Sequence, residues 1–261
     1  MFGQMWAYRV MIGGLVRREI RARYVGSVLG IFWTFLSPLC LLLVYVFVFS
    51  TILQVRFTTE GGSLSFALYL LAGLLPWLAF QEGIIKATTS IVDNAGIVKA
   101  THFPAAVLVI SSVLGTCVTL IVSLTLLVVT LMLMGYGFWW NLAYLPVLIV
   151  LQGILAVGIG LITVSLHTLV RDTLPVLQMF FMMWFYLTPI IYPLAYVPER
   201  WATVFSWNPA TSLITAYRTV LLDGKIPSGT DLLPFCVWAI FLFWFGRAVF
   251  AWVEPIFADV V

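Results

Sequence analysis

The chain has 261 residues, of which 63% are hydrophobic and only 9% carry a formal charge. Soluble domains carry about 25% charged residues, and an ordinary soluble fold of this size could not hide so much apolar surface. The net charge of +3 is too small to suggest nucleic acid as a partner. We therefore expect an all-α polytopic membrane protein, with lipid as the solvent for its apolar surface.

The first 25 residues are basic and are predicted to form an amphipathic helix at the membrane interface. Arg17 and Arg21 lie four residues apart and share one helix face. The apolar run that follows is too long for the core of a signal peptide, and no Ala-x-Ala sequence follows it, so we expect the segment to be retained. The basic residues are Arg9, Arg17, Arg18, Arg21 and Arg23.

Two long stretches without charge indicate membrane crossings. No formal charge occurs between Arg23 and Arg56, or between Lys99 and Arg171. A helix needs about 20 apolar residues to cross a hydrocarbon core roughly 30 Å thick. The first stretch is therefore long enough for one crossing, and the second for two. The whole pattern predicts six transmembrane helices, at about 29–53, 64–86, 105–134, 143–168, 173–192 and 231–251.

The stretch 193–228 does not fit this pattern. It contains four prolines and five charged residues, and an Asn-Pro dipeptide at 208–209 interrupts its short apolar run. Irregular backbone at membrane depth is tolerated where protein buries it. We therefore predict a re-entrant helix pair before the last span rather than a seventh crossing.

The distribution of basic residues predicts the orientation. Six crossings place nine Lys and Arg residues on the side of the termini and four on the other. Because cytoplasmic loops carry the excess of Lys and Arg, we expect both termini in the cytoplasm. A seventh crossing would move Arg247 to the outside and weaken this contrast.

Patterns for catalysis or metal binding are missing from the sequence. It has no phosphate-binding loop and no nucleophile elbow, and its three cysteines have neither metal-ligand nor disulfide spacing. The spans lack a chain of buried carboxylates of the kind that proton-coupled transporters use, whereas Glu82 and Lys86 predict a local ion pair. We expect no catalytic residue, metal or cofactor in this chain, and a source of energy elsewhere.

The predicted loop at 88–103 is the candidate site of coupling to that source. Asp93 or Asn94 could cap a short helix, and Pro104 suits the first turn of the third span. An exposed Ile-Val edge on that helix would fit the groove of a partner protein. An ordinary connecting loop is the alternative.

Aromatic residues make up 16% of the chain and crowd the first and fifth spans. They either anchor the helices in lipid and at its interface, or line a pore whose flat apolar faces let sugar rings slide. The residues that we single out are Phe32, Trp33, Phe35, Tyr45, Phe181, Trp184, Phe185 and Tyr192.

Four regions in chain order carry a family resemblance. They are Arg21-x-Arg23-Tyr24-x-x-Ser27-x-Leu29-Gly30-x-x-Trp33-x-x-Leu36-x-Pro38; the loop from Asn94 to Pro104; Leu187-Thr188-Pro189-Ile190-Ile191-Tyr192-Pro193 with the later Val197-Pro198, Trp207-Asn208-Pro209, Tyr217-Arg218 and Leu221-Leu222-Asp223-Gly224; and the tail Phe257-Ala258-Asp259-Val260-Val261. Each is weak alone, but their order and spacing resemble the permease subunit of ABC-2 type polysaccharide exporters, the Wzm/KpsM type.

The resemblance implies a homodimer in the inner membrane that works with two cytoplasmic ABC ATPase subunits, which bind ATP and Mg²⁺. It implies export of an undecaprenyl-linked glycan of O-antigen or capsule type. The segment 193–222 would form re-entrant helices at the periplasmic mouth, and the aromatic residues would line the channel. The coupling residues would be Asp93, Asn94, Lys99, His102 and Phe103.

The arginines of the first segment allow a further hypothesis. Guanidinium groups match phosphate oxygens, so Arg17, Arg18, Arg21 and Arg23 could contact the pyrophosphate of the lipid carrier; simple anchoring explains them equally well. Two other functions stay open. One is a permease for teichoic acid or another amphiphile, and the other is a membrane enzyme acting on lipid-linked sugars, which would need a polar cluster at one membrane face.

Overall fold

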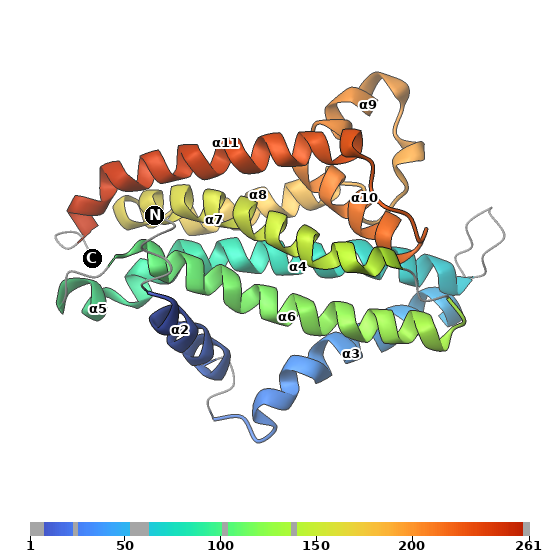
Figure 1. Cartoon of the computed structure of the whole chain (residues 1–261), viewed down its shortest axis with the longest axis horizontal. Coiled ribbons are helices and arrows are strands. Elements are labelled where there is room, and N and C mark those ends of the chain that lie inside the picture. The colour runs from blue at the N-terminus through green and yellow to red at the C-terminus, as the bar shows by residue number, and fades with distance from the viewer. Residues whose placement is uncertain (1–7, 23–25, 53–62, 101–103, 137–139, 258–261) are drawn as a thin grey trace.

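A computed structural model describes residues 8–22, 26–52, 63–100, 104–136 and 140–257. All regular structure in these ranges is helical, which confirms the predicted all-α class. The long helices form a bundle, with α5 (Ala95–Ala100) at one end and α10 (Pro209–Leu221) at the other (Figure 1). We call these the α5 end and the α10 end.

The remaining elements follow the chain order. The helices of the bundle are α3 (Trp33–Val46), α4 (Ser63–Asp93), α6 (Ala106–Leu133), α7 (Leu145–Leu169), α8 (Thr173–Tyr186) and α11 (Gly229–Val253). The other helices are α2 (Arg9–Ala22) and α9 (Glu199–Ser206). The short turns are η1 (Gly30–Phe32), the π-helical η2 (Phe47–Ile52), η3 (Trp140–Tyr144), η4 (Leu194–Tyr196) and η5 (Glu254–Ile256).

Four helices of the described chain are long and apolar enough to cross a membrane, namely α4, α6, α7 and α11. The predicted spans at 105–134, 143–168 and 231–251 agree with three of them to within two residues. α3 and α8 have 14 residues each, or about 21 Å at 1.5 Å per residue. The count of six crossings therefore stays a prediction.

The helix that contains the second predicted span extends beyond residue 86. α4 continues to Asp93, so the first part of the predicted loop is helical. No glycine or proline interrupts residues 84–93. The hydroxyls of Thr88 and Ser90 donate to backbone carbonyls of the same helix at 2.8 Å each, so they are satisfied without competing for the helical amides.

The helix at the fifth predicted span is shorter than the predicted 173–192, since α8 ends at Tyr186. The next residues include Pro189 and Pro193. Proline has no backbone N–H and clashes with the preceding helical turn, so the helix stops before them. The short length of α8 is a direct consequence of these two prolines.

α4 is the central helix and packs against α6, α7 and α10. Small residues set its contacts. A Cβ on Gly83 would lie 2.7 Å from Oγ1 of Thr116 on α6, and a Cβ on Gly160 of α7 would lie 2.8 Å from Cβ of Ala87. Lipid offers no hydrophobic drive for helix association, so close backbone approach at small residues supplies packing energy instead.

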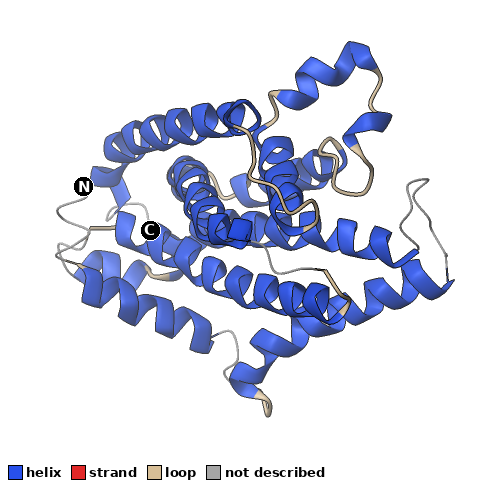
Figure 2. Ribbon diagram, turned by 45° about the vertical axis from the view of Figure 1, so that its right-hand side comes forward, coloured by secondary structure: helices blue, strands red, loops and turns tan. Residues whose placement is uncertain are grey.

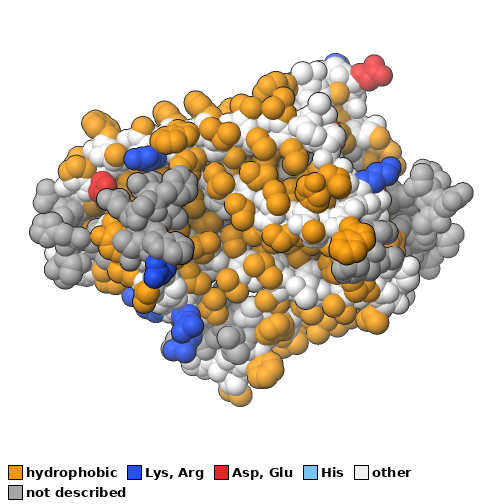
Figure 3. Space-filling view, in the orientation of Figure 1, with side chains coloured by type: hydrophobic (Ala, Val, Ile, Leu, Met, Phe, Trp, Pro, Cys, Tyr) orange, Lys and Arg blue, Asp and Glu red, His pale blue; other side chains and the backbone are white. Residues whose placement is uncertain are grey.

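α7 and α11 cross at a pair of glycines. A Cβ on Gly246 would lie 2.2 Å from the carbonyl oxygen of Gly158, a separation that no side chain could adopt. Away from this crossing α11 is largely exposed, and it runs along the outside of the bundle (Figure 1). Its exposed residues contribute to an apolar surface between the two ends, with basic side chains gathered toward the α5 end (Figure 3).

The segment 193–228 holds two short helices. α9 has 8 residues and α10 has 13, or about 12 Å and 20 Å, so neither could cross a bilayer. α9 has no buried residue and stands away from the bundle (Figure 2). α10 is mostly buried and packs against α4, α7 and α11.

Candidate functional site

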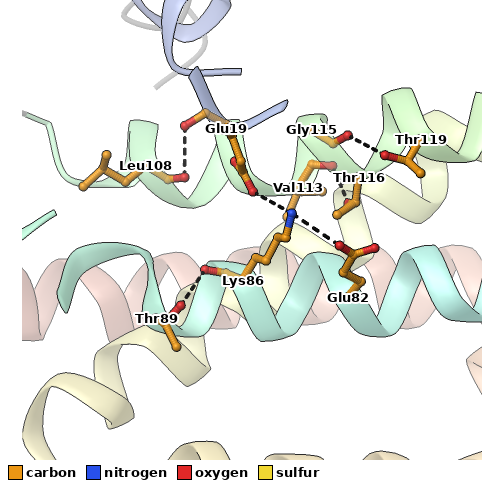
Figure 4. A network of polar contacts seen from close by, with 10 residues as sticks. Glu19, Glu82, Lys86, Thr89, Leu108, Val113, Gly115, Thr116 and Thr119 are labelled. Carbon is orange, nitrogen blue, oxygen red and sulfur yellow. Dashed lines mark hydrogen bonds and ion pairs between the residues drawn. The ribbon is translucent and has the colours of Figure 1, made fainter. Parts of the chain in front are cut away.

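α2 is tied to α4 by an ion pair at the α5 end. Nζ of Lys86 lies 3.3 Å from Oε1 of Glu82 on the same helix and 3.3 Å from Oε1 of Glu19 on α2. Figure 4 shows the Lys86 side chain extending from α4 toward Glu19. The predicted pair between Glu82 and Lys86 is confirmed, and Glu19 turns it into a bridge between two helices.

A second tie joins α2 to the corner between α4 and α5. Nη2 of Arg18 donates to Oδ1 of Asn94. Nδ2 of Asn94 donates to the carbonyl of Ser90 at 2.8 Å, and the Asn94 carbonyl accepts from the amide of Ile97 at 2.9 Å. Asn94 is the single residue between the two helices, so its side chain and backbone together hold α2, α4 and α5.

These two ties border a cavity of about 500 Å³ between α2, α4 and α6. Its charged and amide-bearing lining residues are Arg18, Glu19, Glu82, Lys86, Asp93 and Asn94. α2 lies close over α6 here, since a Cβ on Gly115 would be 3.4 Å from the carboxylate carbon of Glu19. Polar groups of both signs face a space that could admit polar side chains of a partner.

The predicted coupling residues are only partly brought together. Asp93 and Lys99 are exposed at the two ends of the α5 corner, and Asn94 is half-buried. His102 and Phe103 lie outside the described residues. The Ile-Val edge predicted to be exposed is half-buried at Ile97 and Val98, because Val98 packs against the apolar core.

The arginines predicted to contact a lipid pyrophosphate are placed differently from one another. Arg17 and Arg21 are exposed on α2, whereas Arg18 is engaged by Asn94. Arg23 lies outside the described residues. Arg18 is therefore held at the corner between α4 and α5, whereas Arg17 and Arg21 remain the described candidates for this contact.

The aromatic residues predicted to line a channel divide into exposed and covered groups. Phe32, Trp33 and Phe35 are exposed near the start of α3. Tyr45 is half-buried and stacks on Phe49, with ring centroids 5.7 Å apart.

On α8 the predicted residues point inward. Phe181 is fully buried, with its ring centroid 5.9 Å from Trp77 and 6.3 Å from Phe80 of α4. Trp184 and Phe185 are half-buried beside the same tryptophan, at 5.6 Å and 6.0 Å. The outer face of α8 carries exposed side chains outside the set that we singled out, namely Met179, Phe180, Met182, Met183 and Tyr186.

Asn208 joins the end of α8 to the start of α10. Its Oδ1 accepts from the amide of Ala210 at 3.0 Å, which caps α10, and from Nε1 of Trp184 at 2.9 Å. Its Nδ2 donates to Oγ1 of Thr188 at 3.1 Å. Tyr192 lies in the same segment, half-buried, and its hydroxyl donates to the carbonyl of Tyr186 at 2.9 Å.

Arg218 of α10 is a buried arginine whose partners are oxygens of neighbouring segments. Its Nη1 donates to the carbonyl of Pro189 at 2.6 Å and to the hydroxyl of Tyr69 at 2.7 Å. Its Nη2 donates to the carbonyl of Ile190 at 2.6 Å. The guanidinium carbon also lies 3.6 Å from the centre of the Tyr69 ring, so a cation–π contact adds to the hydrogen bonds.

The prolines explain why an arginine is needed at this point. In a continuing helix the amide of residue 193 would donate to the carbonyl of Pro189, but Pro193 has no N–H. A carbonyl left without a donor inside protein or lipid is costly. Arg218 supplies the donor from another helix. Gly73 leaves it room, because a Cβ there would lie 2.8 Å from Nη2.

A family model described as ABC-2 type transporter matches residues 12–222 of the chain. The chain belongs to this family. The match begins within α2 and ends just after α10, so it includes both polar regions described above.

Several proteins are similar over most of their length. The O-antigen export system permease protein RfbA of Myxococcus xanthus is 29% identical over 95% of this chain and 94% of that protein. A protein of the same name from Klebsiella pneumoniae is 28% identical over 81% and 80%. The polysialic acid transport protein KpsM of Escherichia coli is 25% identical over 93% of each chain.

Two functional candidates escaped the sequence reasoning. Glu19 is the one acidic residue in α2, and that isolation among arginines was the available signal. From the sequence, Arg218 was named only within the Tyr217-Arg218 motif. It was placed among the four basic residues on the side opposite the termini. Its position after an uncharged stretch, together with the two prolines at 189 and 193, was the signal that it serves the backbone.

Proposed function

We propose that this chain is the transmembrane permease of an ATP-driven exporter that moves a lipid-linked polysaccharide across the inner membrane. The observation that carries this proposal is the near full-length similarity to permeases named for O-antigen export and polysialic acid transport. The similarity runs through both the α5 corner and the α10 end. It therefore covers the parts that would meet a partner ATPase and the cargo.

The α5 end would face the cytoplasm. Basic side chains gather toward this end (Figure 3), and cytoplasmic surfaces of membrane proteins carry the excess of Lys and Arg. The α10 end, with α9 projecting from it, would face the periplasm. This orientation places α2 and α5 where a soluble ATPase could reach them.

α5 would receive the ATPase and pass its movement to α2. Asn94 is the only residue between α4 and α5, and it accepts the hydrogen bond from Arg18. A displacement of α5 therefore acts on α2 through Arg18, while the bridge from Glu19 to Lys86 ties α2 to α4. ATP and Mg²⁺ would be bound by the partner ATPase subunits.

α3 and α8 give the reason to expect a second copy of the chain. Leu177 and Phe181 are the buried residues of α8, and its outer face is apolar and rich in methionine. Both helices leave about half of their residues exposed in the single chain. Their exposed faces would either pack against the second copy or line the passage for the glycan between the two copies.

Loss of the chain tests the proposal. A strain without it should lose surface polysaccharide and accumulate the carrier-linked glycan on the cytoplasmic side, as measured by surface labelling and by extraction of the carrier lipid. Unchanged surface polysaccharide would contradict the proposal. Turnover of a lipid-linked sugar by the purified chain alone, without any ATPase, would identify a membrane enzyme instead.

A further inference from the structure

A groove of about 910 Å³ lies between α2, α6, α7 and α11. It is separate from the charged cavity between α2, α4 and α6. We call it the α2 groove. α6 contributes a stripe of side chains at helical spacing to its wall, and α7 and α11 contribute further apolar side chains. The α6 stripe consists of Ile110, Val113, Leu114, Cys117, Val118 and Ile121.

The depth of the α2 groove matches one leaflet of a bilayer. Ile110 and Ile121 stand eleven positions apart on α6, which is about 16 Å at 1.5 Å per residue. That is about half of a hydrocarbon core roughly 30 Å thick. Because α6 begins at Ala106 at the α5 end, the groove runs from near that surface to near the middle of the bundle. An acyl chain of a glycerophospholipid spans this depth, whereas a long polyprenyl chain exceeds it.

Two arginines stand at the α2 side of the groove. Arg9 and Arg17 lie eight residues apart on one face of α2, and both are exposed. The side chain of Ile12 lies between them on the same wall. Among the residues that the structure describes, no acidic side chain lines the groove, in contrast to the cavity on the other side of α2. Guanidinium groups bind phosphate oxygens in forked geometry, so the groove is complementary to an anionic headgroup joined to a hydrocarbon chain.

We propose that the α2 groove binds an anionic glycerophospholipid of the leaflet at the α5 end. Its acyl chain lies along the α6 stripe, and its phosphate lies between Arg9 and Arg17. The bound lipid acts as a wedge under α2, whose other face holds Glu19 against Lys86. The site goes beyond the proposed function, because it does not depend on the cargo.

Two adjacent glycines of α2 provide a matched pair of variants. A Cβ at Gly13 or at Gly14 meets no atom within 4 Å, but only Gly13 lines the groove. Gly13→Leu therefore places a side chain in the path of the acyl chain, and Gly14→Leu adds the same side chain outside it. Both changes favour the helix equally, so a difference in lipid binding reports the groove.

The experiment is native mass spectrometry of the full chain, purified in detergent and titrated with defined lipids. Dioleoylphosphatidylglycerol should bind the wild type and Gly14→Leu in preference to dioleoylphosphatidylcholine, and Gly13→Leu should lose this binding. Arg9→Gln and Arg17→Gln should each weaken it about fivefold, as expected for one basic residue near an anionic lipid. Arg21→Gln is the control, because Arg21 is exposed on α2 outside the groove.

Three outcomes would overturn the proposal. Equal binding by Gly13→Leu and Gly14→Leu would exclude the groove as the binding site. Equal binding of the two phospholipids would exclude recognition of the headgroup charge by the arginines. Undecaprenyl phosphate binding in preference to phosphatidylglycerol, with loss in Gly13→Leu, would make the carrier lipid the occupant. If Gly13→Leu fails to fold, Gly153→Met blocks the groove from α7, where a Cβ meets only Sγ of Cys117 at 3.8 Å. None of these readouts requires transport, so failure here leaves the proposed function standing.

Discussion

The two ends of the bundle hold their polar groups in opposite ways. At the α5 end, the side chains of Lys86 and Glu19 are 29% and 23% exposed and border a cavity. At the α10 end, Arg218 is buried and donates to the carbonyls of Pro189 and Ile190. Partly exposed ion pairs contribute about 0–1 kcal/mol, whereas each buried carbonyl that loses its donor costs about 1–3 kcal/mol.

This difference separates a part that can move from a part that cannot. Contacts worth so little can open and close during a transport cycle without endangering the fold. The contacts of Arg218 cannot open without leaving backbone carbonyls unsatisfied. The comparison therefore predicts that changes at the α10 end alter stability, and that changes at the α5 end alter the coupling of ATP hydrolysis to export.

The largest effect is expected from Arg218→Ala. The change leaves the carbonyls of Pro189 and Ile190 without their donor, and each buried unsatisfied group costs about 1–3 kcal/mol. We expect a loss of about 2–6 kcal/mol in the free energy of unfolding, seen as a lower melting temperature in detergent by tryptophan fluorescence. Arg200→Ala is the matched control, because Arg200 is exposed on α9. Equal melting temperatures for the two variants would contradict the proposed difference between the two ends of the bundle.

A smaller effect is expected from Asn208→Ala. It removes the cap of α10 and the contacts with Trp184 and Thr188. A lost cap costs about 1 kcal/mol and each lost hydrogen bond about 1 kcal/mol, so we expect a loss of about 2–3 kcal/mol in the same unfolding measurement. Asn208→Asp keeps the acceptor oxygen for Ala210 and Trp184 and should lose less. If the Asp variant melts no higher than the Ala variant, the cap is not the source of the stability.

The helices of the bundle could be predicted from sequence because one strong rule governs them. Lipid demands long apolar helices, so α6, α7 and α11 were located to within two residues. The ends of α4 and α8 depended on local chemistry instead. α4 continues to Asp93 because no glycine or proline interrupts residues 84–93, and the prolines after Tyr186 end α8.

The site residues could be predicted only in part, because their contacts join distant positions. Asn94 was predicted as a candidate helix cap, and Asn208 was predicted from the Asn-Pro dipeptide at 208–209. The partners of Arg218 lie 28, 29 and 149 positions away, and no local pattern records such a distance. Glu19 was overlooked because the arginines around it favoured a purely basic surface.

A third prediction compares the two acidic partners of Lys86. Glu19→Gln breaks the ion pair between α2 and α4, whereas Glu82→Gln breaks the ion pair within α4. Both should change the free energy of unfolding by less than about 1 kcal/mol. In vesicles containing the permease and its ATPase, Glu19→Gln should lower the glycan exported per ATP hydrolysed, and Glu82→Gln should leave it unchanged. Equal loss in both variants would mean that the charge of Lys86, and not the tie to α2, is what matters.

The smallest effect is expected from salt. Screening shortens the range of charge interactions from about 10 Å at 0.1 M to about 3 Å at 1 M ionic strength, and it acts on the partly exposed pair at the α5 end far more than on the buried Arg218. Raising the salt should therefore lower the coupling of the wild type toward that of Glu19→Gln, with little change in melting temperature. Glu19→Gln itself should be insensitive, because its tie is already broken. A wild type whose melting temperature falls with salt while its coupling holds would reverse the roles assigned to the two ends.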